Sequence, residues 1–137
     1  MEFELLDHPA DIGFRAHGAT VEELFANCAR ALVFIILDPS NIQAGQNVFL
    51  SAEGIDYESL LVNWLNEVLY YVDGKRIALG AFDISELTET RIECIATGEP
   101  RDLQKHPPRL VVKAVTYHQL KVQRLEDGLI AEVYVDV

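Results

Sequence analysis

Hydrophobic residues recur every three to four positions in two stretches of the chain, which is the spacing of one face of an α-helix. Thr20 and Glu23 form a T-x-x-E capping box before the first stretch, and Asp38-Pro39 follows its end. The second stretch follows the turn and N-cap Gly54-Ile55-Asp56, and Gly74 is a natural C′ residue after it. The apolar positions are Leu24, Cys28, Leu32 and Ile35 in the first stretch, and Leu61, Trp64, Leu65, Val68, Leu69 and Val72 in the second. The pattern predicts two amphipathic helices.

Elsewhere apolar and polar residues alternate, which is typical of half-buried β-strands. No linker or repeat divides the chain, so residues 1–137 are expected to form one domain. The predicted fold class is α+β, with two helices packed on a mostly antiparallel sheet of about six or seven strands. The strands are expected near residues 2–6 and 12–16, at Val48 and Leu50, at Phe82 and Ile84, from Ile92 to Ile95, from Leu110 to Leu125 and from Leu129 to Val137.

The last two strands are expected to form a hairpin, because Asp127-Gly128 is a two-residue type I′ turn signal. The register set by this turn keeps the apolar residues of both strands on one face, whereas a slip of one residue does not. The facing pairs would be Leu120 with Val135, Val122 with Val133, His118 with Val137 and Gln119 with Asp136. The chain is therefore expected to end inside a paired strand.

The charge balance limits the function classes. Eleven Lys and Arg residues stand against 22 Asp and Glu residues, a formal net charge of -11, which argues against a protein that binds nucleic acid by itself. Cys28 and Cys94 lie in apolar stretches and are expected to be free thiols in a reducing compartment, although a disulfide between them stays open. The longest apolar run, Ala31 to Leu37, is too short to span a bilayer, and the first residues do not have the layout of a signal peptide. A cytoplasmic protein with no membrane partner is expected.

An ordered end carrying Asp136 and the main-chain carboxylate of Val137 would place two negative charges at one sheet edge. A third carboxylate, Asp11 at the start of an early strand, would complete an oxygen site that suits Ca²⁺, Mg²⁺ or Mn²⁺. Taken from the residues alone, the ordinary alternative is favoured: Asp11 caps a strand and Asp136 faces solvent. The loop from Gly98 to Pro108 carries a polar cluster, and its spacing favours a solvated loop.

Five ordered segments resemble the archease family, and together they run from the first strand to the last residue. The opening resembles the family's D-H-x-A-D-x-G motif, two segments are similar to its helices, one to its K-A-x-T-Y-H-x-L strand, and the last to its hydrophobic-Asp-hydrophobic end. In that order the segments are Asp7-His8-Pro9-Ala10-Asp11-Ile12-Gly13, residues 18–25, residues 60–70, residues 113–120 and Val135-Asp136-Val137.

The resemblance implies a protein cofactor rather than an enzyme: a partner of the RtcB-type tRNA-splicing ligase that promotes guanylylation of the ligase and multiple turnover. RNA and GTP would be handled only through the ligase. The resemblance also implies a divalent metal, Ca²⁺ first, held by Asp11, Asp136 and Val137. Further residues that could surround this metal or contact the partner are Asp7, His8, Lys105, His106, Tyr117 and His118.

Two other readings stay open from the residues. His8 and His118 could instead be packed and hydrogen-bonded within the sheet, and Lys105 and His106 could be part of a solvated loop. A metal-dependent hydrolase would use the same carboxylates with a histidine as general base, although the chain has no H-E-x-x-H, P-loop or nucleophile elbow. A general acidic chaperone or interaction module would rest on the surface charge alone.

Overall fold

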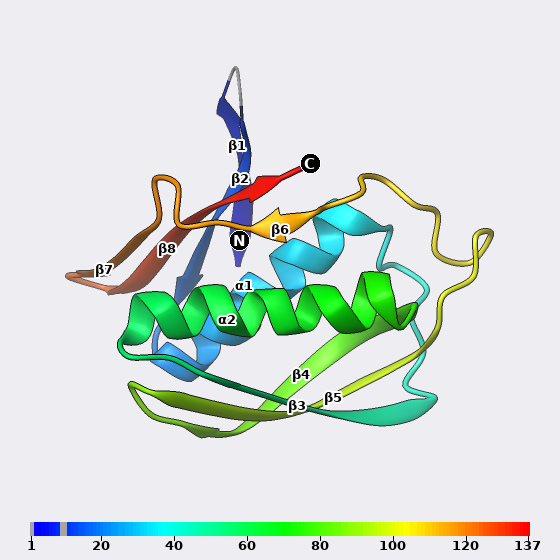
Figure 1. Ribbon diagram of the computed structural model, residues 1–137, viewed down its shortest axis with the longest axis horizontal. Helices are drawn as coiled ribbons and strands as arrows, with labels where there is room; N and C mark the ends of the chain where they lie inside the picture. The colour runs from blue at the N-terminus through cyan, green and yellow to red at the C-terminus, as the bar shows by residue number, and fades with distance from the viewer. Residues whose placement is uncertain (1, 9–10) are drawn as a thin grey trace.

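Two helices lie between two β-sheets in the computed structural model, which describes residues 2–8 and 11–137 (Figure 1). Apolar side chains from both helices and from the inner faces of both sheets form one core. The elements are β1 (Phe3–His8), β2 (Asp11–Gly18), α1 (Val21–Ile36), β3 (Gln46–Glu53), α2 (Tyr57–Leu69), the π-helical turn η1 (Tyr70–Gly74), β4 (Ile77–Leu87), β5 (Arg91–Pro100), β6 (Ala114–Val115), β7 (Lys121–Leu125) and β8 (Gly128–Asp136).

The strands form two separate sheets in which every described pairing is antiparallel. The larger sheet has the order β1-β2-β8-β6, with β7 also paired to β8, and the smaller sheet has the order β3-β5-β4. The α+β prediction with two helices is confirmed. The mostly antiparallel pairing is also confirmed, and the described residues form eight strands divided between two sheets, one on each side of the helices.

Both helices begin as their capping residues predict. The Thr20 side chain accepts a hydrogen bond from the Glu23 N–H at 3.1 Å, and Asp56 and Ser59 form a reciprocal capping box at the start of α2. The predicted end of α2 is wrong in detail, because the chain continues through η1 to Gly74. Gly74 is not among the residues with positive φ, whereas Arg76 has a φ of 59° and takes the left-handed conformation two residues later.

Trp64 joins the two helices at the centre of the core. Its side chain is fully buried, its indole Nε1–H donates to the Phe25 carbonyl of α1 at 3.0 Å, and its ring meets Phe82 of β4 edge-on. Cys28 and Cys94 are free and buried, as expected, and burial raises the pKa of Cys94 to about 12. None of the helices in residues 2–8 and 11–137 has the length and apolar character that crossing a membrane requires.

The last hairpin forms, but in a different register from the predicted one. Its turn is Glu126-Asp127, and Leu125 pairs with Gly128, so Val122 faces Ala131 rather than Val133. Gly128 belongs to the strand: its φ is +150°, and a Cβ there would lie 2.9 Å from the Gly18 carbonyl oxygen. The shift is two residues, so the apolar side chains keep the face that the pattern predicted.

The predicted strand from Leu110 to Leu125 is broken into β6 and β7. Between them the chain turns outward: Gln119 has a φ of 52°, and the Leu120 N–H donates to the Tyr117 carbonyl at 3.1 Å. Both short strands pair with the same edge of β8, one after the other. The end of β8 is therefore paired with β6 rather than with residues 118–120.

Candidate functional site

The backbone register brings the two predicted carboxylate residues to one end of the larger sheet. Ile12 of β2 pairs with Val135 of β8, and the next residues along the two strands are Asp11 and Asp136. On the other side of β8, Ala114 of β6 pairs with Asp136. We call this end of β2, β8 and β6 the Asp136 end.

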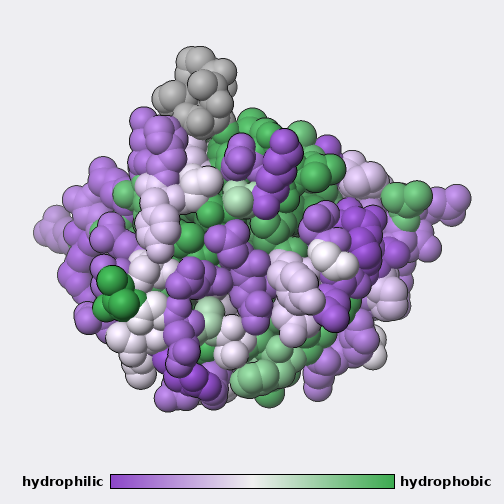
Figure 2. Space-filling view, in the orientation of Figure 1, coloured by the Kyte–Doolittle hydropathy of each residue, from purple (hydrophilic) through white to green (hydrophobic). Residues whose placement is uncertain are grey.

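Main-chain contacts hold Asp136 and leave its side chain exposed. The Lys113 N–H donates to the Asp136 carbonyl at 2.7 Å, while the Asp136 side chain faces solvent and Val137 is 48% exposed. Figure 2 shows the largest hydrophobic area in the upper part of this face, around where Figure 1 places the C-terminus, with hydrophilic residues and smaller hydrophobic groups mixed over the rest. The Asp136 end is therefore an open, solvent-accessible surface.

The donor chemistry of the Asp136 end suits a hard cation. Carboxylate oxygens are the ligands that Ca²⁺ and Mg²⁺ prefer. Asp136 supplies a carboxylate, and its strand β8 is paired on both edges. Among the residues whose side chains are described, no group of three or more His, Cys, Asp or Glu comes together as a metal site. The predicted side-chain roles of Asp7, His8 and Asp11 lie outside the described residues, so the predicted ligand set stays a prediction.

Close packing next to the Asp136 end involves Gly13, the last residue of the opening motif. Gly13 pairs with Tyr134, and a Cβ on Gly13 would lie 2.6 Å from a Tyr134 ring carbon and 2.8 Å from the Val133 carbonyl oxygen. Glycine therefore lets the Tyr134 ring lie directly on β2. The same tyrosine's carbonyl accepts a hydrogen bond from the Thr116 hydroxyl at 3.2 Å.

Tyr117 and His118 lie in the outward turn between β6 and β7. Both side chains are exposed, and the His118 ring meets the Tyr134 ring edge-on with a centroid distance of 6.3 Å. The predicted pairing of His118 with Val137 is wrong, because the turn takes His118 out of the sheet. His118 still packs beside a residue two positions from Asp136.

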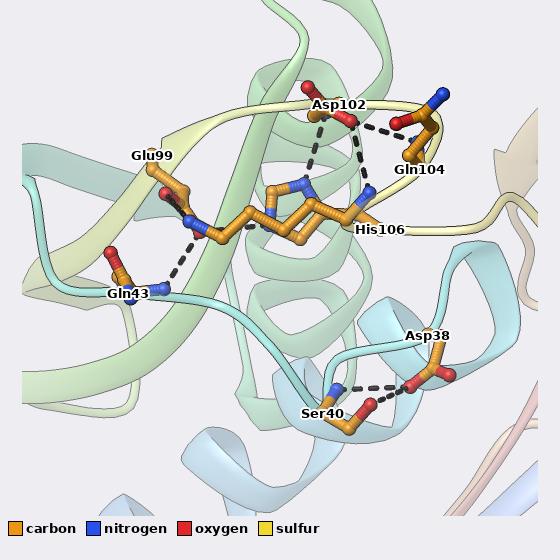
Figure 3. A network of polar contacts seen from close by, with 8 residues as sticks. Asp38, Ser40, Gln43, Glu99, Asp102, Gln104 and His106 are labelled. Carbon is orange, nitrogen blue, oxygen red and sulfur yellow. Dashed lines mark hydrogen bonds and ion pairs between the residues drawn. The ribbon is translucent and has the colours of Figure 1, made fainter.

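Lys105 and His106 belong to a different polar cluster, in the loop after β5. The His106 ring is fully buried, accepts from the Asp102 N–H at Nδ1 (3.1 Å) and pairs through Nε2 with Glu99 (2.9 Å). The Lys105 ammonium lies 2.7 Å from the same carboxylate, which also accepts from the Gln43 N–H (Figure 3). The solvated-loop reading is wrong for His106, because its buried ring links the loop to Glu99 of β5, and the Glu99 carboxylate in turn accepts from the Gln43 N–H.

The Glu99 carboxylate gives this cluster a pH dependence. Hydrogen bonds from Lys105, then from the Gln43 N–H and His106, lower the pKa of Glu99 from 4.5 to about 2. Because the pKa is lower in the folded state, the stability that Glu99 contributes is present above pH 4.5 and is lost as the pH falls toward 2. We expect Glu99→Gln to have a lower free energy of unfolding than wild type at neutral pH. Urea unfolding at a series of pH values should show this difference shrinking as the pH falls from 4.5 toward 2.

The control is Glu126→Gln, which changes an exposed turn carboxylate. A Glu99→Gln deficit that stays constant from neutral pH to pH 2 would show that the cluster does not act through the ionised carboxylate.

Sequence reasoning gave no role to Asn66 of α2, whose side chain forms two hydrogen bonds with Val115 of β6. The feature of the sequence that could have indicated this role is a side-chain amide beside the apolar face of the second predicted helix. A surface hollow of about 430 Å³ lies beside this contact and is lined in part by Tyr70, Val111 and Lys113. A second hollow, of about 640 Å³, lies at the opposite end of β8, around Gly128.

Relatives of this chain come from several archaea. A protein archease of Methanosarcina barkeri is 39% identical over 142 residues, spanning 99% of this chain and 96% of the relative. A protein archease of Pyrococcus furiosus is 38% identical over 130 residues, spanning 93% of this chain and 92% of the relative. The sequence similarity therefore extends over nearly the full length of this chain and of each relative.

Solved structures have the same fold. The solution structure of Methanobacterium thermoautotrophicum protein 1598 superimposes with a TM-score of 0.79 at 33% identity and covers 99% of both chains. A Thermotoga maritima protein described as an archease, possible chaperone, has a TM-score of 0.62 at 20% identity and covers 96% of this chain and 94% of its own. The model of the Archease protein family (MTH1598/TM1083) matches residues 3–137. The chain belongs to the archease family.

Proposed function

We propose that this protein activates an RtcB-type tRNA-splicing ligase by promoting guanylylation of the ligase and its multiple turnover. Family membership over residues 3–137 is the observation that carries the proposal. The protein itself acts as a cofactor and catalyses no reaction, and RNA and GTP reach it only through the ligase. The open Asp136 end supports this role, since a docking surface must be accessible whereas a hydrolytic metal needs a sheltered cleft.

The proposed metal ligands are Asp11, Asp136 and Val137, with Ca²⁺ as the first candidate and Mg²⁺ or Mn²⁺ as alternatives. The register of β2 and β8 supports this set, because Ile12 pairs with Val135, and Asp11 and Asp136 are the next residues along these two strands. A bound cation would neutralise the carboxylates and offer positive charge toward nucleotide phosphates. The protein's own residues hold the donors at the end of a sheet, where a partner can approach.

The net charge suits docking on a basic partner. A ligase that binds RNA needs a positively charged surface, and a chain with a net charge of -11 would be steered toward it. The same charge disfavours direct competition for the RNA backbone. The two buried, free thiols suit a reducing compartment, so we place the protein in the cytoplasm with its ligase.

Multiple-turnover RNA ligation by the cognate ligase, with and without this protein, tests the proposal. We expect the ligase alone to stop after about one turnover and the ligase with this protein to continue until the RNA is joined. An unrelated acidic protein and a chemically denatured client enzyme serve as controls. Stimulation by the unrelated protein, or equal rescue of the client enzyme by this chain, would favour a general chaperone over a ligase activator.

A further inference from the structure

β6 is a strand of only two residues that lies at the edge of the larger sheet. It nevertheless borders the Asp136 end, because Ala114 pairs with Asp136 and the adjacent Lys113 N–H donates to the Asp136 carbonyl. A short edge strand has few contacts with which to resist local opening. β6 therefore needs stabilising contacts from outside the sheet in addition to the few hydrogen bonds that Lys113 and Thr116, on either side of it, donate to β8.

The side chain of Asn66 meets this need from the helix layer. Its Nδ2 donates to the Val115 carbonyl at 3.1 Å, and its Oδ1 accepts from the Val115 N–H at 2.9 Å. A side-chain amide that bonds to both the main-chain N–H and the carbonyl of one residue makes the hydrogen bonds that a neighbouring strand would make. Asn66 is on a rigid support, because Trp64 and Leu65 beside it are fully buried in the core.

We propose that Asn66 is a positioning residue: by fixing Val115 it holds β6, and β6 in turn sets where Asp136 lies at the end of β8. The inference rests on the proposed function in so far as the Asp136 end is taken to bind a metal and the ligase. Asn66 itself is not a ligand. It acts through three links in sequence, the amide pair with Val115, the pairing of β6 with β8, and the main-chain hydrogen bond from Lys113 to Asp136.

Asn63→Ala is a matched control for Asn66→Ala. Asn63 lies on the same helix and donates from its side-chain amide to the Glu53 carbonyl of β3 at 2.7 Å, so it ties α2 to the other sheet. Both substitutions replace asparagine by the best helix former and remove a helix-to-strand amide contact. Asn66→Asp is the graded variant, because it keeps an acceptor for the Val115 N–H and loses the donor to the Val115 carbonyl.

Amide hydrogen exchange on the intact protein is the first readout. In Asn66→Ala we expect the Val115 and Lys113 amides to exchange about tenfold faster or more, since two hydrogen bonds that resist local opening are lost. Asn66→Asp should give a smaller increase, and Asn63→Ala should leave both amides at the wild-type rate. The second readout is Ca²⁺ titration, in which Asn66→Ala should bind about tenfold more weakly and Asn63→Ala should bind as wild type.

The outcomes separate this inference from the proposed function. Wild-type exchange at Lys113 in Asn66→Ala, or faster exchange without weaker Ca²⁺ binding, would overturn the positioning role. An equal effect of Asn63→Ala on Lys113 would also overturn it, because the cause would then be general loosening of α2. A wild-type protein that binds no divalent cation would remove the proposed metal site, and the exchange result alone would then decide whether Asn66 positions Asp136.

Discussion

Asp136→Ala is expected to abolish stimulation of the ligase and to weaken Ca²⁺ binding by about 100-fold or more, a larger loss than an outer-shell change gives. The substitution removes the described carboxylate at the Asp136 end. It leaves the backbone contacts intact, because Asp136 pairs with Ala114 and accepts from Lys113 through its main chain. Isothermal titration with Ca²⁺ and multiple-turnover ligation, both on protein with a wild-type unfolding midpoint, measure the two effects.

Asp127→Ala makes the same change of charge at the other end of β8, in the exposed turn. It should leave Ca²⁺ binding and stimulation unchanged. Asp136→Asn keeps one neutral oxygen donor and should fall between wild type and Asp136→Ala. Full stimulation by folded Asp136→Ala would contradict the role given to this carboxylate, and equal losses in both alanine variants would point to net charge instead.

Trp64→Ala is expected to lower the free energy of unfolding by about 3–5 kcal/mol, the usual range for truncating a buried tryptophan. Trp64 fills the space between α1, α2 and β4, and its removal also leaves the Phe25 carbonyl without its indole donor. A loss of this size is a large part of the stability of an ordinary domain. Urea unfolding monitored by circular dichroism gives the free energy of unfolding. The dependence of that free energy on urea concentration is compared between the variants.

Tyr70→Ala provides the comparison, since Tyr70 directly follows α2 and its side chain is 51% exposed. We expect a change of about 1 kcal/mol there, from loss of the edge-on contact with Tyr71 and of the Lys75 ammonium over the ring. Trp64→Phe keeps most of the apolar volume and loses the Nε1–H, so its cost should lie between the two. A loss below about 1 kcal/mol for Trp64→Ala would mean that the core refills the space and that Trp64 does not join the layers as described.

Local signals in the sequence predicted the helices well. The Thr20 and Asp56 caps each bind a backbone N–H three residues ahead, and helical periodicity depends on neighbours within two turns. Most strand positions were predictable for the same reason, but the break between β6 and β7 was not. The division into two sheets was not, because alternation shows that a strand has a buried face without showing which strand lies beside it.

The register of the last hairpin shows a limit of the apolar pattern. Registers two residues apart place the same side chains inward, so the pattern excludes a slip of one residue and allows a slip of two. The choice depends on contacts from elsewhere in the chain: Gly128 lies against the Gly18 carbonyl, and the turn at Gln119 removes residues 116–120 from the sheet. Neither contact has a signal in the hairpin sequence itself.

The candidate site also has features that the sequence predicts and features that depend on contacts between distant segments. Asp136 could be placed near the end of a paired strand from the sequence, whereas its neighbours on β2 and β6 follow from pairings between distant segments. Lys105 and His106 matched the chemistry of a partner contact, but the His106 ring is buried against Glu99, and burial of a loop histidine is not visible in the spacing of residues. The role of Asn66 was not predicted, because it bonds to main-chain groups of Val115, and the identity of that residue does not indicate such a contact.

The pairing of β2 with β8 also has a consequence for biosynthesis. Arg15 and Glu132, which bond across these strands, are 117 positions apart, so β2 cannot form this pairing until β8 has been made. Such distant pairings form slowly and late. On a translating ribosome the smaller sheet and both helices have all their residues well before β8 leaves the exit tunnel. The Asp136 end therefore assembles only after β8 has emerged, later than the smaller sheet and both helices.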